Sequence, residues 1–80
     1  MEARLGAIII LVDKGSDTGR INEIISDHAE VIIGRQGIPL KGKGKSIISL
    51  VLEGNTDDFG SLSGKLGRLE GIKAKSLLIS

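Results

Sequence analysis

Glycine and lysine residues near the middle of the chain bear a partial likeness to a phosphate-binding loop. Within residues 37–46, Gly37 is followed five residues later by Gly42-Lys43, but Gly44 stands where that loop requires a hydroxyl. The segment also leads into a β-branched run typical of a strand, whereas a phosphate-binding loop opens a helix whose first N–H groups contact the phosphates. Nucleotide hydrolysis is therefore not predicted, and a flexible basic hairpin explains the segment better.

Three lysines of that hairpin, Lys41, Lys43 and Lys45, could bind an anion together with Arg35. A nucleic-acid-associated regulator that uses this hairpin is one functional hypothesis, because lysines that neutralise phosphates drive such binding. Proteins that bind single strands add aromatic platforms on which bases stack, and the one aromatic residue, Phe59, belongs to an apolar helix face. We therefore favour partners other than nucleic acid.

The turn after the first apolar run, Lys14-Gly15-Ser16, could hold a small anion. It comes directly before residues suited to start a helix, and the free N–H groups of a helix start attract carboxylates. Ordinary capping by Ser16 or Asp17 explains the same residues.

A second candidate set combines the run 34–39 with two cations further along the chain. The run contains Arg35, Gly37 and Pro39, and the later cations are Lys65 and Arg68. Small residues beside arginine suit the close approach of a ligand or a partner. A bulged edge strand and a solvated helix end are the structural explanation of the same set.

Histidine and cysteine are too scarce to indicate a metal site or a thiol nucleophile. His28 is the one histidine and cysteine is absent, so a metal would have to recruit carboxylates or a second subunit. The acidic residues cluster where helices are expected to start, which capping explains. No Ser–His–carboxylate grouping is visible in the sequence, and we predict no cofactor, no metal and no catalysis.

An aliphatic composition indicates one globular domain over residues 1–80. Apolar residues make up 40% of the chain and aromatic residues 1%, and the formal net charge is +1. A chain of this length buries only about 60–65% of its unfolded surface, so its own core is marginal. No signal peptide or membrane-length apolar run appears, which favours a cytoplasmic protein without a membrane partner.

Hydropathy patterns predict six secondary-structure elements. Continuous β-branched runs indicate strands, and apolar residues three and four apart indicate helices. Glycines and Pro39 make the second strand irregular, so that we expect it to be bulged or at a sheet edge. The predicted elements are a strand 5–12, a helix 17–29, a strand 31–39, a strand 46–52, a helix from about 55 to Gly67 or Gly71, and a strand 72–79.

This order of elements predicts an α+β fold, a ferredoxin-like βαββαβ sandwich. Two split βαβ halves give a four-stranded antiparallel sheet with both helices on one face. The helix-free face of such a sheet should be polar in a monomer, but residues 5–12 are apolar on both faces. Because monomers rarely expose such a patch, we predict a homo-oligomer, a dimer or tetramer, built on a twofold interface.

Three stretches, 31–39, 46–49 and 62–72, give the sequence a family resemblance. Their most specific runs are Gly34-Arg35-Gln36-Gly37-Ile38-Pro39 and Gly64-Lys65-Leu66-Gly67-Arg68-Leu69. Over nearly the whole chain they resemble short bacterial proteins described as regulators of the iron-only hydrogenase system. That family is similar to ACT-type ligand-binding domains and to the C-terminal domain of the nickel-responsive repressor. The resemblance implies the ferredoxin-like fold and a regulatory role.

Likeness to ACT domains implies a small-molecule effector bound near the first strand–helix turn, at residues 13–16. Nickel sensing does not carry over, because the repressor uses several histidines and a cysteine and this chain has one histidine and no cysteine. We therefore predict a homo-oligomeric regulatory module without catalysis, which binds a small-molecule effector or a partner regulatory protein. The predicted ligand-binding residues are Lys14, Gly15, Ser16, Arg35, Gly37, Pro39, Lys65 and Arg68.

Overall fold

The apolar patterns of the sequence form the expected strands and helices in the computed structural model, which describes residues 3–80. Each boundary lies close to its predicted position. The elements are β1 (Arg4–Val12), α1 (Thr18–Asp27), a 3₁₀ turn η1 (Ala29–Val31), β2 (Ile32–Leu40), β3 (Lys45–Gly54), α2 (Thr56–Gly67) and β4 (Ile72–Leu78).

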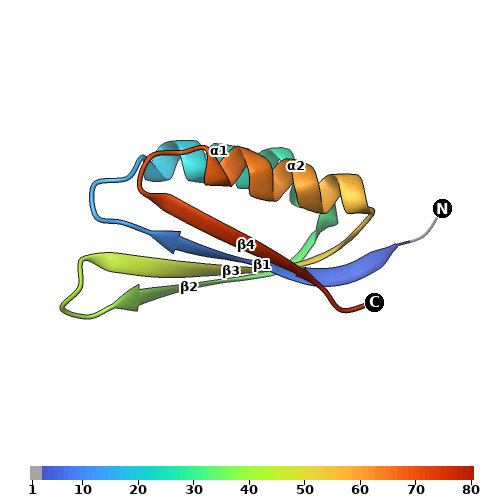
Figure 1. Cartoon of the computed structure of the whole chain (residues 1–80), viewed down its shortest axis with the longest axis horizontal. Helices are drawn as coiled ribbons and strands as arrows, with labels where there is room; N and C mark the ends of the chain where they lie inside the picture. Colours follow the sequence, from blue (N-terminus) through green and yellow to red (C-terminus); the bar gives the residue numbers. More distant parts are fainter. Residues whose placement is uncertain (1–2) are drawn as a thin grey trace.

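The four strands form one antiparallel sheet in the order β2-β3-β1-β4. Both helices lie on the same face of this sheet, and no other element covers the opposite face in the described part of the chain (Figure 1). The strands β1 and β3 are central, and β2 and β4 are the edges. This confirms the ferredoxin-like α+β fold that the element order predicts.

Alternation along the strands places the core between the sheet and the two helices. On β1, Ile8 and Ile10 have no exposed surface, whereas their neighbour Ile9 faces the other way and is 45% exposed. The core is aliphatic except for one phenylalanine, as the composition requires. Its members are Ile8, Ile10, Val12, Ile21, Ile24, Ile25, Leu50, Leu52, Phe59, Leu62, Leu66 and Ile72.

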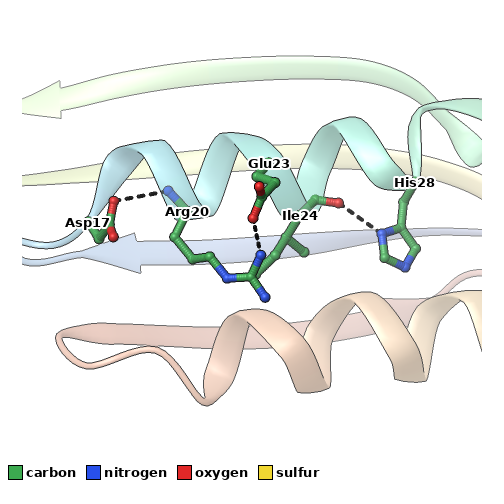
Figure 2. A network of polar contacts seen from close by, with 5 residues as sticks. All are labelled: Asp17, Arg20, Glu23, Ile24 and His28. Atoms are coloured by element: carbon green, nitrogen blue, oxygen red, sulfur yellow. Dashed lines mark hydrogen bonds and ion pairs between the residues drawn. The ribbon is translucent and has the colours of Figure 1, made fainter.

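Both helices begin at side chains that satisfy free backbone N–H groups. The carboxylate of Asp17 accepts from the N–H of Arg20 at 3.0 Å (Figure 2). At the start of α2, the side chain of Asn55 accepts from the N–H of Asp58 at 2.8 Å. The Asp58 carboxylate accepts in return from the N–H of Asn55 at 2.9 Å, which completes a capping box. Capping therefore accounts for Asp17 and Asp58.

The helix predicted over 17–29 ends two residues earlier in the structure, at Asp27. His28 leaves the helical conformation with φ −115° and ψ 21°, and η1 then leads into β2. The predicted irregularity of the second strand is also confirmed. It is an edge strand, and its register with β3 shifts between Ile32 and Gly34.

Candidate functional site

Three chain connections meet at one end of the molecule. The β1–α1 turn (13–17), the β2–β3 hairpin (41–44) and the α2–β4 turn (68–71) lie together at the left-hand end of Figure 1. The sheet register requires this arrangement, because Val12 at the end of β1 pairs with Ser46 of β3 and with Ile72 of β4. Segments far apart in the sequence thus become neighbours here.

Hydrogen bonds through Gly71 tie the β1–α1 turn to the α2–β4 turn. The carbonyl oxygen of Gly71 accepts from the N–H of Asp13 at 2.9 Å and from the hydroxyl of Ser16 at 3.4 Å. Gly71 has φ +79°, and a Cβ at this position would lie 2.6 Å from Ser16 Oγ. Both the backbone conformation and the lack of space therefore favour glycine here.

The β2–β3 hairpin and the first residue of β3 contact the β1–α1 turn, and a lysine takes part in each contact. Lys45 Nζ lies 3.4 Å from Asp13 Oδ1. The aliphatic part of Lys14 packs on the hairpin, since a Cβ built on Gly44 would lie 3.3 Å from Lys14 Cδ. The Lys45–Asp13 pair is about half exposed, so it contributes only about 0–1 kcal/mol and leaves both charges accessible.

Two adjoining depressions share Asp13 and Gly71 at this end. The larger, of about 370 Å³, lies between the β1–α1 and α2–β4 turns and is lined by Asp13, Lys14, Gly15, Ser16, Glu70 and Gly71. The smaller, of about 160 Å³, is lined by Leu11, Asp13, Lys45, Gly71, Ile72 and Lys73. Ammonium and carboxylate groups thus lie close together in both depressions. Such an arrangement can bind a small molecule that carries a positive and a negative charge.

The structure places Lys14, Gly15 and Ser16 in one depression, whereas none of the other predicted site residues lines it. Arg35, Gly37 and Pro39 lie on the edge strand β2. The guanidinium of Arg35 donates to the side-chain oxygen of Asn22 on α1 at 2.7 Å, which links the edge strand to the helix layer.

Lys65 belongs to α2 and Arg68 is its C-terminal cap. The helix α2 packs against β4, the edge strand opposite β2. They border a surface depression of about 190 Å³ whose other lining residues are Gly60, Ser61 and Gly64. The expectation that they join the run 34–39 in one set is therefore not met, because β2 is at the opposite edge.

Sequence reasoning overlooked the part that the start of β4 plays in this site. Glu70, Gly71 and Lys73 line the depressions together with the predicted turn, and Lys45 lines the smaller one. The predicted topology already indicates that these residues lie at the site. A ferredoxin-like fold pairs β1 with both β3 and β4, so the residues before β3 and β4 must lie beside the end of β1.

His28 connects the two helices. Its Nδ1 lies 2.8 Å from the carbonyl oxygen of Ile24, to which only a protonated nitrogen can donate (Figure 2). Its Nε2 lies 3.4 Å from the hydroxyl of Ser61 on α2 and can then accept. The imidazole is thus oriented by a backbone carbonyl, and it serves as a link between α1 and α2 at the end of a helix.

The helix-free face of the sheet carries exposed aliphatic side chains, as the alternation of the strands predicts, and the charged Lys73 and Lys75 of β4 lie on the same face. Ile9, on a central strand, is 45% exposed and Leu77 is 66% exposed. Cross-strand pairing makes the patch continuous, because Ala7 lies between Val51 and Leu77, and Leu11 lies beside Ile47. We call this the apolar sheet face; its members are Leu5, Ala7, Ile9, Leu11, Ile38, Ile47, Val51 and Leu77.

Residues 3–80 lack two further features. No group of three or more His, Asp or Glu side chains in that range is placed to hold a metal ion. No helix of the same range is long and apolar enough to cross a membrane.

The fold and these surfaces define a small α+β module with a charged depression at one end and an apolar sheet face. The chain belongs to the TM1266-like family: residues 4–76 match the family model, whose description is "Iron-only hydrogenase system regulator, putative". This confirms the family resemblance of the sequence. The search of curated proteins found no match.

Solved structures support the same assignment. The uncharacterized protein TM1266 from Thermotoga maritima is 32% identical, with a TM-score of 0.92 over 99% of this chain and 100% of that chain. LarC2, the C-terminal domain of a cyclometallase involved in synthesis of the NPN cofactor of lactate racemase, is 13% identical. Its TM-score is 0.51 over 98% of this chain and 58% of that chain, a similarity that concerns the fold alone.

Proposed function

We propose that this protein is a homo-oligomeric regulatory module that binds a small charged effector and has no catalysis of its own. The observation that carries the proposal is the apolar sheet face, which the helices leave uncovered. The family description supports the regulatory role.

Self-association follows from the cost of leaving that face in water. Apolar surface contributes about 25 cal/mol for each Å² removed from water, and a contiguous patch of aliphatic side chains is rare on monomers. An 80-residue chain also has a small core, so burial in an interface adds stability that the single fold lacks.

The effector site is the pair of depressions between the β1–α1 and α2–β4 turns. Lys14 and Lys73 supply positive charge, Asp13 and Glu70 supply negative charge, and all four are exposed. This combination suits the carboxylate and ammonium groups of an amino acid. The likeness to ACT domains points to the same turn.

A role without catalysis agrees with the placement of the reactive side chains. Enzymes gather an acid, a base or a nucleophile in a concave site that excludes water. Here His28 links two helices at the surface, and the charged depressions are open and lack histidine.

The assembly is tested by placing a charge in the apolar sheet face. Ile9→Lys buries an unpaired ammonium in any interface on that face, so we expect the dissociation constant to rise by more than about 100-fold. Gly60→Lys is the matched control, because it adds the same charge to the exposed side of α2, where a Cβ meets open space. Sedimentation velocity over a range of concentrations measures both. A monomeric wild-type protein at high concentration contradicts the proposed assembly.

The effector is tested by thermal denaturation in the presence of each of the common amino acids. A ligand at ten times its Kd stabilises by about 1.4 kcal/mol, which raises the Tm of a domain this small by about 6–11 °C. Lys14→Ala and Lys73→Ala should each reduce that shift, whereas Lys43→Ala, at the hairpin tip outside both depressions, should not. If no amino acid changes the Tm, the proposed effector class is wrong.

One observation favours the second candidate function, nucleic-acid binding: the fold places Lys14 and Lys73 at the same end as the hairpin lysines. Binding of this kind weakens steeply with salt. Fluorescence anisotropy with a short labelled DNA should then show tighter binding at low salt, and the Lys41→Ala/Lys43→Ala double variant should lose it. No binding at low salt dismisses this candidate.

A further inference from the structure

Charge is segregated along the long axis of the molecule, which extends over 43 Å. The end with the three connections carries five lysines and Arg68, and the acidic residues of its connections are Asp13, Asp17 and Glu70. The opposite end, where α1 leads into β2 and β3 leads into α2, is acidic except for Arg4 (Figure 1). The lysines are Lys14, Lys41, Lys43, Lys45 and Lys73, and the acidic residues of the opposite end are Asp27, Glu30, Glu53, Asp57 and Asp58.

The charged residues on the apolar sheet face show the same division into a basic end and an acidic end. Lys45 and Glu53 both project from this face on β3, since they share the alternation of exposed Val51. They are eight residues apart, about 27 Å at about 3.4 Å per residue. The row of Ile9, Ser49 and Gln36 lies midway between them.

Two twofold arrangements can stack this face on a second copy. An axis parallel to the strands places the basic ends of the two copies over each other. An axis perpendicular to the strands, in the plane of the interface, reverses the partner and places each basic end over the partner's acidic end. Like charges brought together oppose association, whereas opposite charges favour it.

We propose that a second copy of this chain packs on the apolar sheet face with its strands antiparallel to those of the first, about a twofold axis through the Ile9 row. This deepens the proposed function, on whose self-association it rests. Each interface then contains the Lys45–Glu53 contact twice, once at each end, because a twofold interface repeats every pair.

Side-chain size is complementary at two positions in this orientation. The twofold rotation places the row on one side of Ile9 opposite the partner's row from the other side of Ile9. Ala7 therefore faces the partner's Leu11, and Gly34 faces the partner's Ile38. At these two positions a small residue lies opposite a large one, which suits close packing, whereas Val51 faces the partner's Ile47 and Leu77 faces the partner's Lys73. Lys75 of the Ile9 row lies opposite the partner's Lys75, but on the edge strand β4, where both long side chains extend past the interface into solvent.

The available area is sufficient for a specific dimer. Four strands of seven to ten residues, about 4.8 Å apart, give a face on the order of 500 Å² per copy. The two copies together bury about 1,000 Å², which is at the lower limit of specific interfaces. Such a dimer is weak enough for a ligand at its rim to influence it.

That rim includes the smaller charged depression. Leu11, Lys45 and Lys73 line it from the apolar sheet face, so the partner's Ala7, Glu53 and Leu77, which lie opposite them in the antiparallel dimer, close over it. The second copy therefore completes the depression.

Engineered cysteines test the orientation, because the natural chain has none. Lys45→Cys and Glu53→Cys are prepared separately, one with a purification tag, mixed and oxidised under mild conditions. We expect the mixed disulfide and no disulfide between identical variants. Disulfides between two Lys45→Cys chains overturn the orientation and leave the dimer intact, whereas a dimer without any disulfide places the interface elsewhere. A monomeric protein overturns the self-association itself.

Charge reversal supplies a second measurement that needs no cross-link. Lys45→Glu and Glu53→Lys should each raise the dimer dissociation constant about three- to tenfold, and the double variant should restore it to within about twofold of wild type. Independent, additive effects of the two changes contradict the contact.

Discussion

Gly6 of β1 lies close to both β4 and α2. A Cβ at this position would lie 2.2 Å from the carbonyl oxygen of Leu77 and 2.8 Å from Cε1 of Phe59. Gly6→Ala must therefore displace the backbone of an edge strand. We expect a loss of about 1–3 kcal/mol in the free energy of unfolding, measured by urea denaturation.

Gly60→Ala is the control for that substitution. Gly60 is exposed in the middle of α2, and a Cβ there meets no atom within 4 Å. Alanine should raise the free energy of unfolding by about 0.5–1 kcal/mol because it favours the helix. If both variants are stabilised, the close approach at Gly6 is wrong.

At the level of secondary structure, the start of α2 depends on its reciprocal cap. Asn55→Ala removes the acceptor for the Asp58 N–H, and we expect it to lower the free energy of unfolding by about 1 kcal/mol. Asn55→Ser keeps a side-chain oxygen at the cap and should retain most of the stability. Equal losses in both variants contradict a capping role. Urea denaturation at matched protein concentration compares them.

The two edge strands differ in how they resist further pairing. β2 carries a bulge and Pro39, and both disrupt the ladder that a further strand would need. β4 instead places Lys73 and Lys75 on the helix-free side. Lysine along an edge is unfavourable for strand addition, so association through the broad face is better suited to this sheet than growth at its edges.

Considered as a whole, the molecule should gain stability by associating. Because only folded chains associate into the dimer, the Tm of the wild-type protein should rise with protein concentration. Ile9→Lys, which places a charge in the interface, should show a lower Tm that does not depend on concentration. Differential scanning calorimetry across about a hundredfold range of concentration checks both. A wild-type Tm independent of concentration contradicts self-association.

The fold was predictable because its signals are local. The β-branched runs, the helical spacing of Ile21, Ile24 and Ile25, and the capping residues Asp17 and Asn55 all act within a few residues of chain. The end of α1 was less predictable, because the contacts of the His28 ring with Ile24 and with Ser61 on α2 depend on tertiary packing.

By itself the sequence determined the order of the elements, the faces of the strands and therefore the uncovered apolar side of the sheet. Only the tertiary structure decided which charged residues meet. Asp13, Lys45 and Gly71 are brought together by the register of β1 with β3 and β4, whereas Arg35 and Lys65 are kept apart at opposite sides. The physical reason is the separation of the interacting residues along the chain. Periodicity and capping involve close neighbours in the sequence. A depression, or the division of the molecule into a basic and an acidic end, depends on residues tens of positions apart.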